Sequence, residues 1–164
     1  MSKVITFSRT YAGGETLFVE KFLTSMRYDY KDIKYLHRLL RLNNKSTNAG
    51  KLTFTQITEF FDSLKDVNSM KIHTIRSGFR FKSGELFSPR VWSGLPYRSP
   101  QIIFWDDVEC DVQKIEISDF KVKIDGREID KMETYHLAHN DGFNDLVSFW
   151  SWFQDDFKGQ IIGW

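Results

Sequence analysis

The spacing of apolar residues changes near residue 70 and divides the chain into a helical first part and a strand-rich second part. Residues 3–8 alternate as in a strand. After a break at residues 12–14, apolar side chains recur at helical spacing in residues 15–26, 29–44 and 53–64. From Met70 on, Gly, Ser and Pro separate short β-type runs at residues 71–76, 86–92, 101–105 and 108–113.

Residues 119–129 predict a hairpin. Phe120, Val122 and Ile124 alternate with polar residues and share one expected strand face. Asp125-Gly126 follows them, and this dipeptide is a strong signal for a tight turn between antiparallel strands. We therefore expect two paired strands joined at Asp125.

The last part of the chain predicts a helix and a closing strand. Asn144 can cap a helix whose apolar stripe continues to Phe157, and Gly159 is expected to end it. Residues 160–164 then form a strand. Helices at both ends and a largely antiparallel strand set between them predict an α+β fold with a small, barrel-like sheet, in one domain over residues 1–164.

The net charge of +1 hides an uneven distribution of charge along the chain. Residues 27–51 hold seven Lys/Arg and two Asp/Glu, and residues 71–105 hold six and one. Residues 106–156 hold five and fourteen. Such asymmetry can steer a polyanion toward one face, although charge runs are also typical of solvated surfaces.

The sequence predicts a cytoplasmic protein without a cofactor. Cys110 is the only cysteine, which excludes an internal disulfide and fits a reducing compartment. We find no run of apolar residues long enough for a signal peptide or a membrane span. His136 and His139 have a spacing that could hold a metal on a helix, but no third ligand is evident nearby, so no metal site is predicted.

Residues 71–76 could form one wall of a site. Alternation on a strand places Thr74 and Arg76 on the same face. Lys71 would point the opposite way in a regular strand, and it joins Thr74 only if the chain is still turning at residues 68–70. A desolvated Lys can activate a hydroxyl, and the fork of an Arg can hold a phosphate. A solvated strand edge is the alternative reading of this cluster.

The segment that follows combines basic and aromatic residues. Arg80 and Lys82 alternate with Phe79 and Phe81 in a predicted turn. Basic groups interleaved with aromatic rings are what single-stranded nucleic acid requires of a protein surface. The two rings could equally point into the core. Asp141 is predicted to form a turn with Gly142 or to complement the N-terminus of the helix that follows. Its alternative role is a carboxylate that faces Lys71 and Thr74 and positions the Lys or moves a proton.

Four ordered blocks resemble the ASCH domain, a PUA-like β-barrel with flanking helices. They are TFSR at residues 6–9, KIHTIRSGFRFKSGELFSPRVWSGLPYRS at 71–99, HNDGFNDLVSFWSWF at 139–153 and GQIIGW at 159–164. Residues 27–68 look like a helical insertion relative to compact members of that family. Their apolar stripe packs on its own domain or serves a protein partner.

The resemblance implies binding of RNA, a nucleotide or a nucleoside in a basic cleft. Arg9, Arg76, Arg80, Lys82 and Trp92 are the ligand-binding residues expected for that role. Some small members of the family are amidohydrolases that deacylate N4-acetylcytidine with a Lys, a Thr and a Glu. On that pattern Lys71, Thr74 and Asp141 are the catalytic residues, with Asp141 one methylene shorter than the family's Glu.

Overall fold

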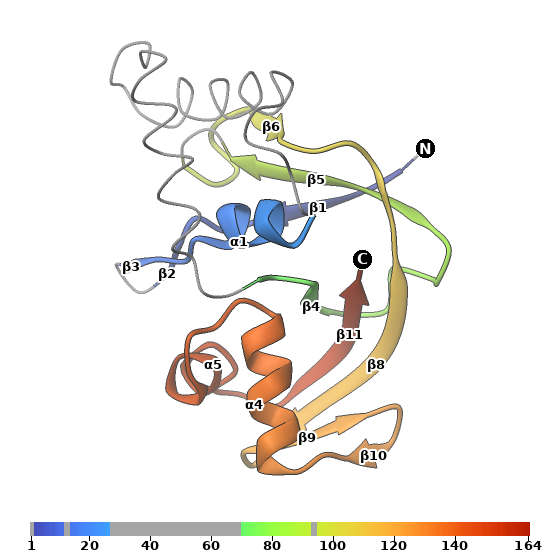
Figure 1. Cartoon of the computed structure of the whole chain (residues 1–164), viewed down its shortest axis with the longest axis vertical. Helices are drawn as coiled ribbons and strands as arrows, with labels where there is room; N and C mark the ends of the chain where they lie inside the picture. The colour runs from blue at the N-terminus through green and yellow to red at the C-terminus, as the bar shows by residue number, and fades with distance from the viewer. Residues whose placement is uncertain (1, 12–13, 27–69, 93–94) are drawn as a thin grey trace. The chain divides into compact units, whose positions relative to one another are not determined.

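The computed structural model describes residues 2–11, 14–26, 70–92 and 95–164 (Figure 1). The chain forms two compact units, one of Met1–Asn68 with Phe87–Val108 and the other of Ser69–Leu86 with Glu109–Trp164. The single domain expected from the sequence stays a prediction. The helices expected at 29–44 and 53–64, and with them the insertion, lie outside the described residues.

The first unit is built on a small mixed sheet. β1 (Lys3–Phe7) runs parallel to β5 (Leu86–Trp92), which pairs antiparallel with β6 (Gln101–Ile103) and also pairs with β7 (Val108–Glu109). β2 (Thr10–Tyr11) and β3 (Gly14–Glu15) form a short hairpin before α1 (Phe18–Ser25). The buried rings of Phe7, Phe22 and Phe104 meet edge to face with centroids 5.3 to 5.6 Å apart, and they form the core of this unit.

The second unit contains a five-stranded antiparallel sheet with two helices beside it (Figure 1). Its strand order is β10-β9-β8-β11-β4, an open path of β10 (Arg127–Glu128), β9 (Lys121–Ile124), β8 (Asp111–Ser118), β11 (Phe157–Gly163) and β4 (His73–Ser77). The helices are α4 (Lys131–Asn140) and α5 (Leu146–Trp152). The α+β class expected from the sequence is confirmed.

The last helix is shorter than its apolar stripe predicts. Asp145, not Asn144, caps α5, because its side chain accepts a hydrogen bond from the backbone N–H of Ser148 at 2.7 Å. The helix ends at Trp152, and Phe157 opens β11 instead of extending the helix. Phe157 still packs on Phe153, with ring centroids 5.0 Å apart, so a ring contact between helix and strand continues the apolar stripe.

Gly159 has a different role from the helix stop that was expected. It lies within β11, and a Cβ atom at this position would come 2.0 Å from the carbonyl oxygen of Arg76 on β4. That distance is far below any contact between real Cβ atoms and backbone. Glycine is therefore required here for the close approach of two paired strands.

Two tight turns join β8, β9 and β10. Asp125 and Gly126 both have positive φ, 49° and 85°, and they form the expected turn between β9 and β10. Asp119 and Phe120 also have positive φ, 50° and 58°, in the turn between β8 and β9. Phe120 is therefore an exposed turn residue and not the strand residue that alternation predicted.

No helix within the described ranges is long and apolar enough to cross a membrane.

Candidate functional site

The clearest polar feature of the second unit is a buried ion pair between Lys71 and Asp141. Lys71 Nζ donates to Asp141 Oδ1 and, at 2.5 Å, to the Asp141 carbonyl oxygen. The two residues are 1% and 4% exposed. A charge at this depth costs several kcal/mol of desolvation unless it is paired, so each residue depends on the other.

The end of α4 places Asp141 for this contact. Asp141 is the C-cap residue, and Gly142 follows with φ 92°. The N–H groups of Gly142 and Phe143 donate to the carbonyls of His139 and Ala138 at 2.9 and 3.0 Å. These bonds define a Schellman motif, in which glycine takes the left-handed conformation after the cap. Asp141 therefore ends α4 and does not complement the N-terminus of the next helix.

The start of β4 brings Lys71 to the same place. The N–H of Ile72 donates to the carbonyl of Asn140, the last residue of α4, at 2.9 Å. Lys71 precedes the first strand residue, His73, and is not bound by regular alternation. Its ammonium group lies at the C-terminus of α4, where the helix dipole favours a positive charge.

His73 belongs to the same buried cluster, although sequence reasoning gave it no role. Its Nε2 lies 3.1 Å from the carbonyl oxygen of Leu137 on α4. The pKa of His73 is lowered to about 4, mainly by burial; the charge of Asp141 opposes this change, the charge of Lys71 adds to it, and the bond to the Leu137 carbonyl opposes it. His73 is therefore neutral at pH 7. The sequence feature that could have indicated a role for His73 is its position between Lys71 and Thr74, two expected catalytic residues.

Thr74 and Arg76 follow on β4. Thr74 is buried and pairs in register with Ile162 of β11, and Arg76 is half-buried opposite Gln160. The hydrogen bonds that join Lys71 to Asp141 do not include the Thr74 hydroxyl. The structure thus brings Lys71 and Asp141 together in one contact. The third expected catalytic residue, Thr74, lies within β4, which begins shortly after Lys71.

We call residues 78–82, which follow β4, the basic loop. Arg80 and Lys82 are exposed in it, and Phe79 is 60% exposed. Phe81 is buried, and its N–H and carbonyl bond the side-chain amide of Gln160 at 3.0 and 2.8 Å. One of the two aromatic rings thus belongs to the core and the other lies at the surface.

The remaining expected ligand-binding residues, Arg9 and Trp92, lie in the first unit. Arg9 is half-buried between β1 and β2. Trp92 ends β5, and its ring centroid lies 5.2 Å from that of Tyr97. Their part in a site with the basic loop stays a prediction.

Across the described residues, no three side chains of His, Cys, Asp or Glu come together as a metal site. Of the two histidines at metal spacing, His136 is exposed and His139 stacks on Tyr135.

Comparisons with protein-family models, with curated proteins and with solved structures found no match to this chain.

Proposed function

We propose that the chain is an ASCH-type module with a PUA-like fold that binds RNA, or a nucleotide or nucleoside, through the basic loop. The observation that carries this proposal is the arrangement of Phe79, Arg80 and Lys82 at the surface. An exposed aromatic ring offers a stacking platform for a base, and two neighbouring cations can contact the phosphates on either side of it.

The anchoring of the basic loop supports the same role. The two hydrogen bonds between Phe81 and Gln160 tie the middle of the loop to β11. At the end of the loop, the Lys82 N–H donates to Glu85 Oε2 at 2.8 Å. A loop held at both of these points loses less conformational entropy when a ligand binds.

A binding experiment with matched variants tests the proposal. A fluorescently labelled single-stranded RNA is titrated with the protein, and anisotropy gives the affinity. We expect Phe79→Ala to weaken binding at least about fivefold, as loss of a stacking platform does. Arg80→Ala and Lys82→Ala should each weaken it by a smaller factor.

Phe120→Ala and Lys121→Ala are the matched controls. They change an exposed ring and an exposed cation at the turn between β8 and β9, in the same unit. The proposed role of the basic loop would be refuted if the control variants lost as much RNA affinity as the basic-loop variants. It would also be refuted if the original protein did not bind RNA.

The alternative function is hydrolysis of the amide bond in an N4-acylated cytidine. The observation that favours it is the direct contact of Lys71 Nζ with the Asp141 carboxylate. In this proposal Thr74 is the nucleophile, Lys71 its activator and Asp141 the acid. Incubation with N4-acetylcytidine, followed by chromatography of released cytidine, tests it. Turnover that does not exceed that of Thr74→Ala excludes this substrate.

A further inference from the structure

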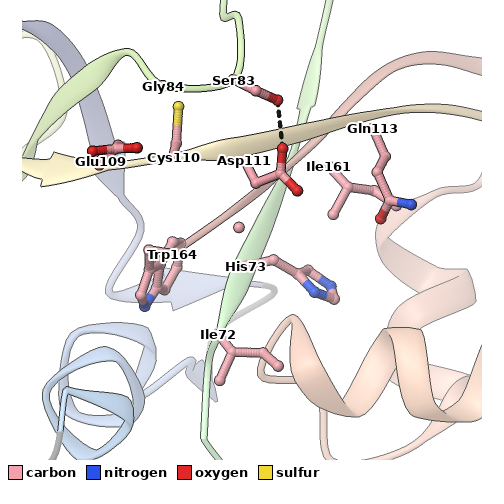
Figure 2. Close-up of a pocket in the computed structure, with 11 residues that line it drawn as sticks. Ile72, His73, Ser83, Gly84, Glu109, Cys110, Asp111, Gln113, Ile161 and Trp164 are labelled. Atoms are coloured by element: carbon pink, nitrogen blue, oxygen red, sulfur yellow. Dashed lines mark hydrogen bonds between the residues drawn. The ribbon is translucent and has the colours of Figure 1, made fainter.

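A pocket of about 560 Å³ lies in the second unit, apart from the residues proposed above to bind or to react (Figure 2). The lining of this pocket includes none of the expected catalytic residues Lys71, Thr74 and Asp141, and no residue of the basic loop. Its volume falls within the range of about 300–1,000 Å³ that is typical of small-molecule sites.

The lining combines buried and half-buried apolar side chains with exposed polar ones. Ile161 and Cys110 are buried, and Trp164 is half-buried beside Ile72. The backbone N–H of Trp164 donates to the Ile72 carbonyl at 3.2 Å, and this bond holds the two residues together. Figure 2 shows Trp164, Ile72 and His73 on one side of the pocket and Asp111, Cys110 and Ser83 on the other. An indole face of this kind attracts flat or positively charged groups.

Two carboxylates lie at the rim. Glu109 and Asp111 flank Cys110 and are both exposed. Asp111 Oδ1 accepts from Ser83 Oγ and, at 2.9 Å, from the Val112 N–H. These bonds, that of Ser83 first, lower the pKa of Asp111, so it carries its charge at neutral pH. No Lys or Arg is among the lining residues that the structure describes.

His73 adds a further acceptor. Because a carbonyl oxygen can only accept, Nε2 is the nitrogen that carries the proton and donates to Leu137. In the neutral ring Nδ1 is then an acceptor, on a side chain that is 8% exposed and lines the pocket. The charged groups of the lining are thus both negative, which is the opposite of what a phosphate requires.

We propose that this pocket binds a small organic cation, with an ammonium or amidinium group at Glu109 and Asp111 and a flat or apolar body against Trp164. A charge-assisted hydrogen bond to a carboxylate and a cation–π contact with indole are the two interactions that such a ligand makes best. The site differs from the basic loop in position and in the sign of its charge, so its ligand is independent of RNA.

Three ligands of one shape test the proposal, since benzamidine is cationic, benzamide neutral and benzoate anionic. Each is titrated into the isotope-labelled full chain, and the indole N–H signal of Trp164 is followed by NMR. We expect benzamidine to bind about tenfold more tightly than benzamide, because an ion pair near a protein surface adds this much, and benzoate not to bind.

Variants locate the bound cation. Glu109→Gln and Asp111→Asn should each weaken benzamidine binding about two- to fivefold, as expected for a partly exposed ion pair. Glu116→Gln, an exposed acid on β8 outside the pocket, is the matched control and should leave it unchanged. Arg80→Ala should also leave it unchanged, which separates this site from the proposed RNA site.

Equal affinity for benzamide and benzamidine would overturn the proposal, and so would an unchanged affinity for benzamidine in both carboxylate variants. A Trp164 signal that does not shift up to about 10 mM benzamidine would also overturn it, because this concentration exceeds the dissociation constants of even weak specific complexes. The substituted side chains are exposed, and we therefore expect each variant to fold. A thermal unfolding curve like that of the original protein confirms that it does.

Discussion

Lys71 and Asp141 are removed from water together, and each keeps the other from being a lone buried charge. Asp141→Ala removes the carboxylate that balances the charge of the Lys71 ammonium group in the interior. We expect this variant to lower the free energy of unfolding by about 3–5 kcal/mol, measured by urea denaturation. Replacing both residues by apolar ones, as in Lys71→Met with Asp141→Leu, should recover much of that loss.

The exposed pair of Lys158 and Glu116, with N and O 3.7 Å apart, is the control for this measurement. Glu116→Ala should cost less than about 1 kcal/mol, because water screens a surface pair. A cost of Asp141→Ala no larger than that of Glu116→Ala would contradict the role given to the buried pair.

His73 predicts how stability depends on pH. The ordinary His pKa of 6.5 describes the unfolded chain, and the folded pKa is about 4. Between these values the unfolded state binds more protons, so stability is full above pH 6.5 and falls as the pH drops toward 4. The total loss is roughly 3 kcal/mol.

His73→Gln keeps a donor for the Leu137 carbonyl and removes the titration. Its free energy of unfolding should therefore vary less between pH 6.5 and pH 4 than that of the original protein. His136→Gln, a change at an exposed histidine of α4, should leave the pH dependence as it was. Identical pH profiles for the original protein and His73→Gln would be evidence against a buried neutral His73.

Sequence reasoning could place residues on strand faces but could not show which distant residues meet them. The period of β4 predicts that His73 and Thr74 face opposite ways. This alternation does not show that Leu137 and Asp141 lie next to the strand. They do so only because α4 ends beside Ile72. The burial of His73 and Lys71 is thus a tertiary effect. The contact of Lys71 with Asp141 was one of the alternatives that the sequence left open for Asp141, because no spacing along the chain brings the two residues together.

At the scale of the elements, the boundary between α5 and β11 depends on competition between two periods. Phe149, Phe153 and Phe157 fit a helical stripe, yet Phe157–Gly163 also pairs with β8 over its whole length. Seven ladder positions outweigh one further helical turn, because they bury the strand in the middle of a sheet. Local propensity alone could not have located this boundary.

The contact of Gly159 with β4 predicts a large effect of a small change. Gly159→Ala would drive a methyl group into the Arg76 carbonyl, which lies 2.0 Å from the Cβ position. We expect a loss of about 2–4 kcal/mol in urea denaturation, as for other overpacking and strain effects. Gly163→Ala is the matched control in the same strand, since its nearest neighbour would be 3.8 Å away. Similar losses for both variants would show that glycine is not required by this strand contact.

At the scale of the whole molecule, a net charge of +1 means that attraction of RNA must come from local charge. The proposed contacts involve the two cations of the basic loop, Arg80 and Lys82. For single strands, the logarithm of the affinity should then fall with the logarithm of the salt concentration with a slope of about −1.4. Anisotropy titrations between about 50 and 200 mM salt should show a loss of about sevenfold. A slope near zero would exclude phosphate contacts.

The position of β11 between β8 and β4 also determines the order in which the second unit can be assembled during synthesis. β4 is made early, but its sheet partner is β11, whose residues follow some eighty positions later. Until residues 157–163 leave the ribosome, β4 has no partner strand in this sheet, and β8 to β10 form a three-stranded meander. Pairing across such a separation is slow, so we expect the insertion of β11 between β4 and β8 to limit the folding rate of the unit.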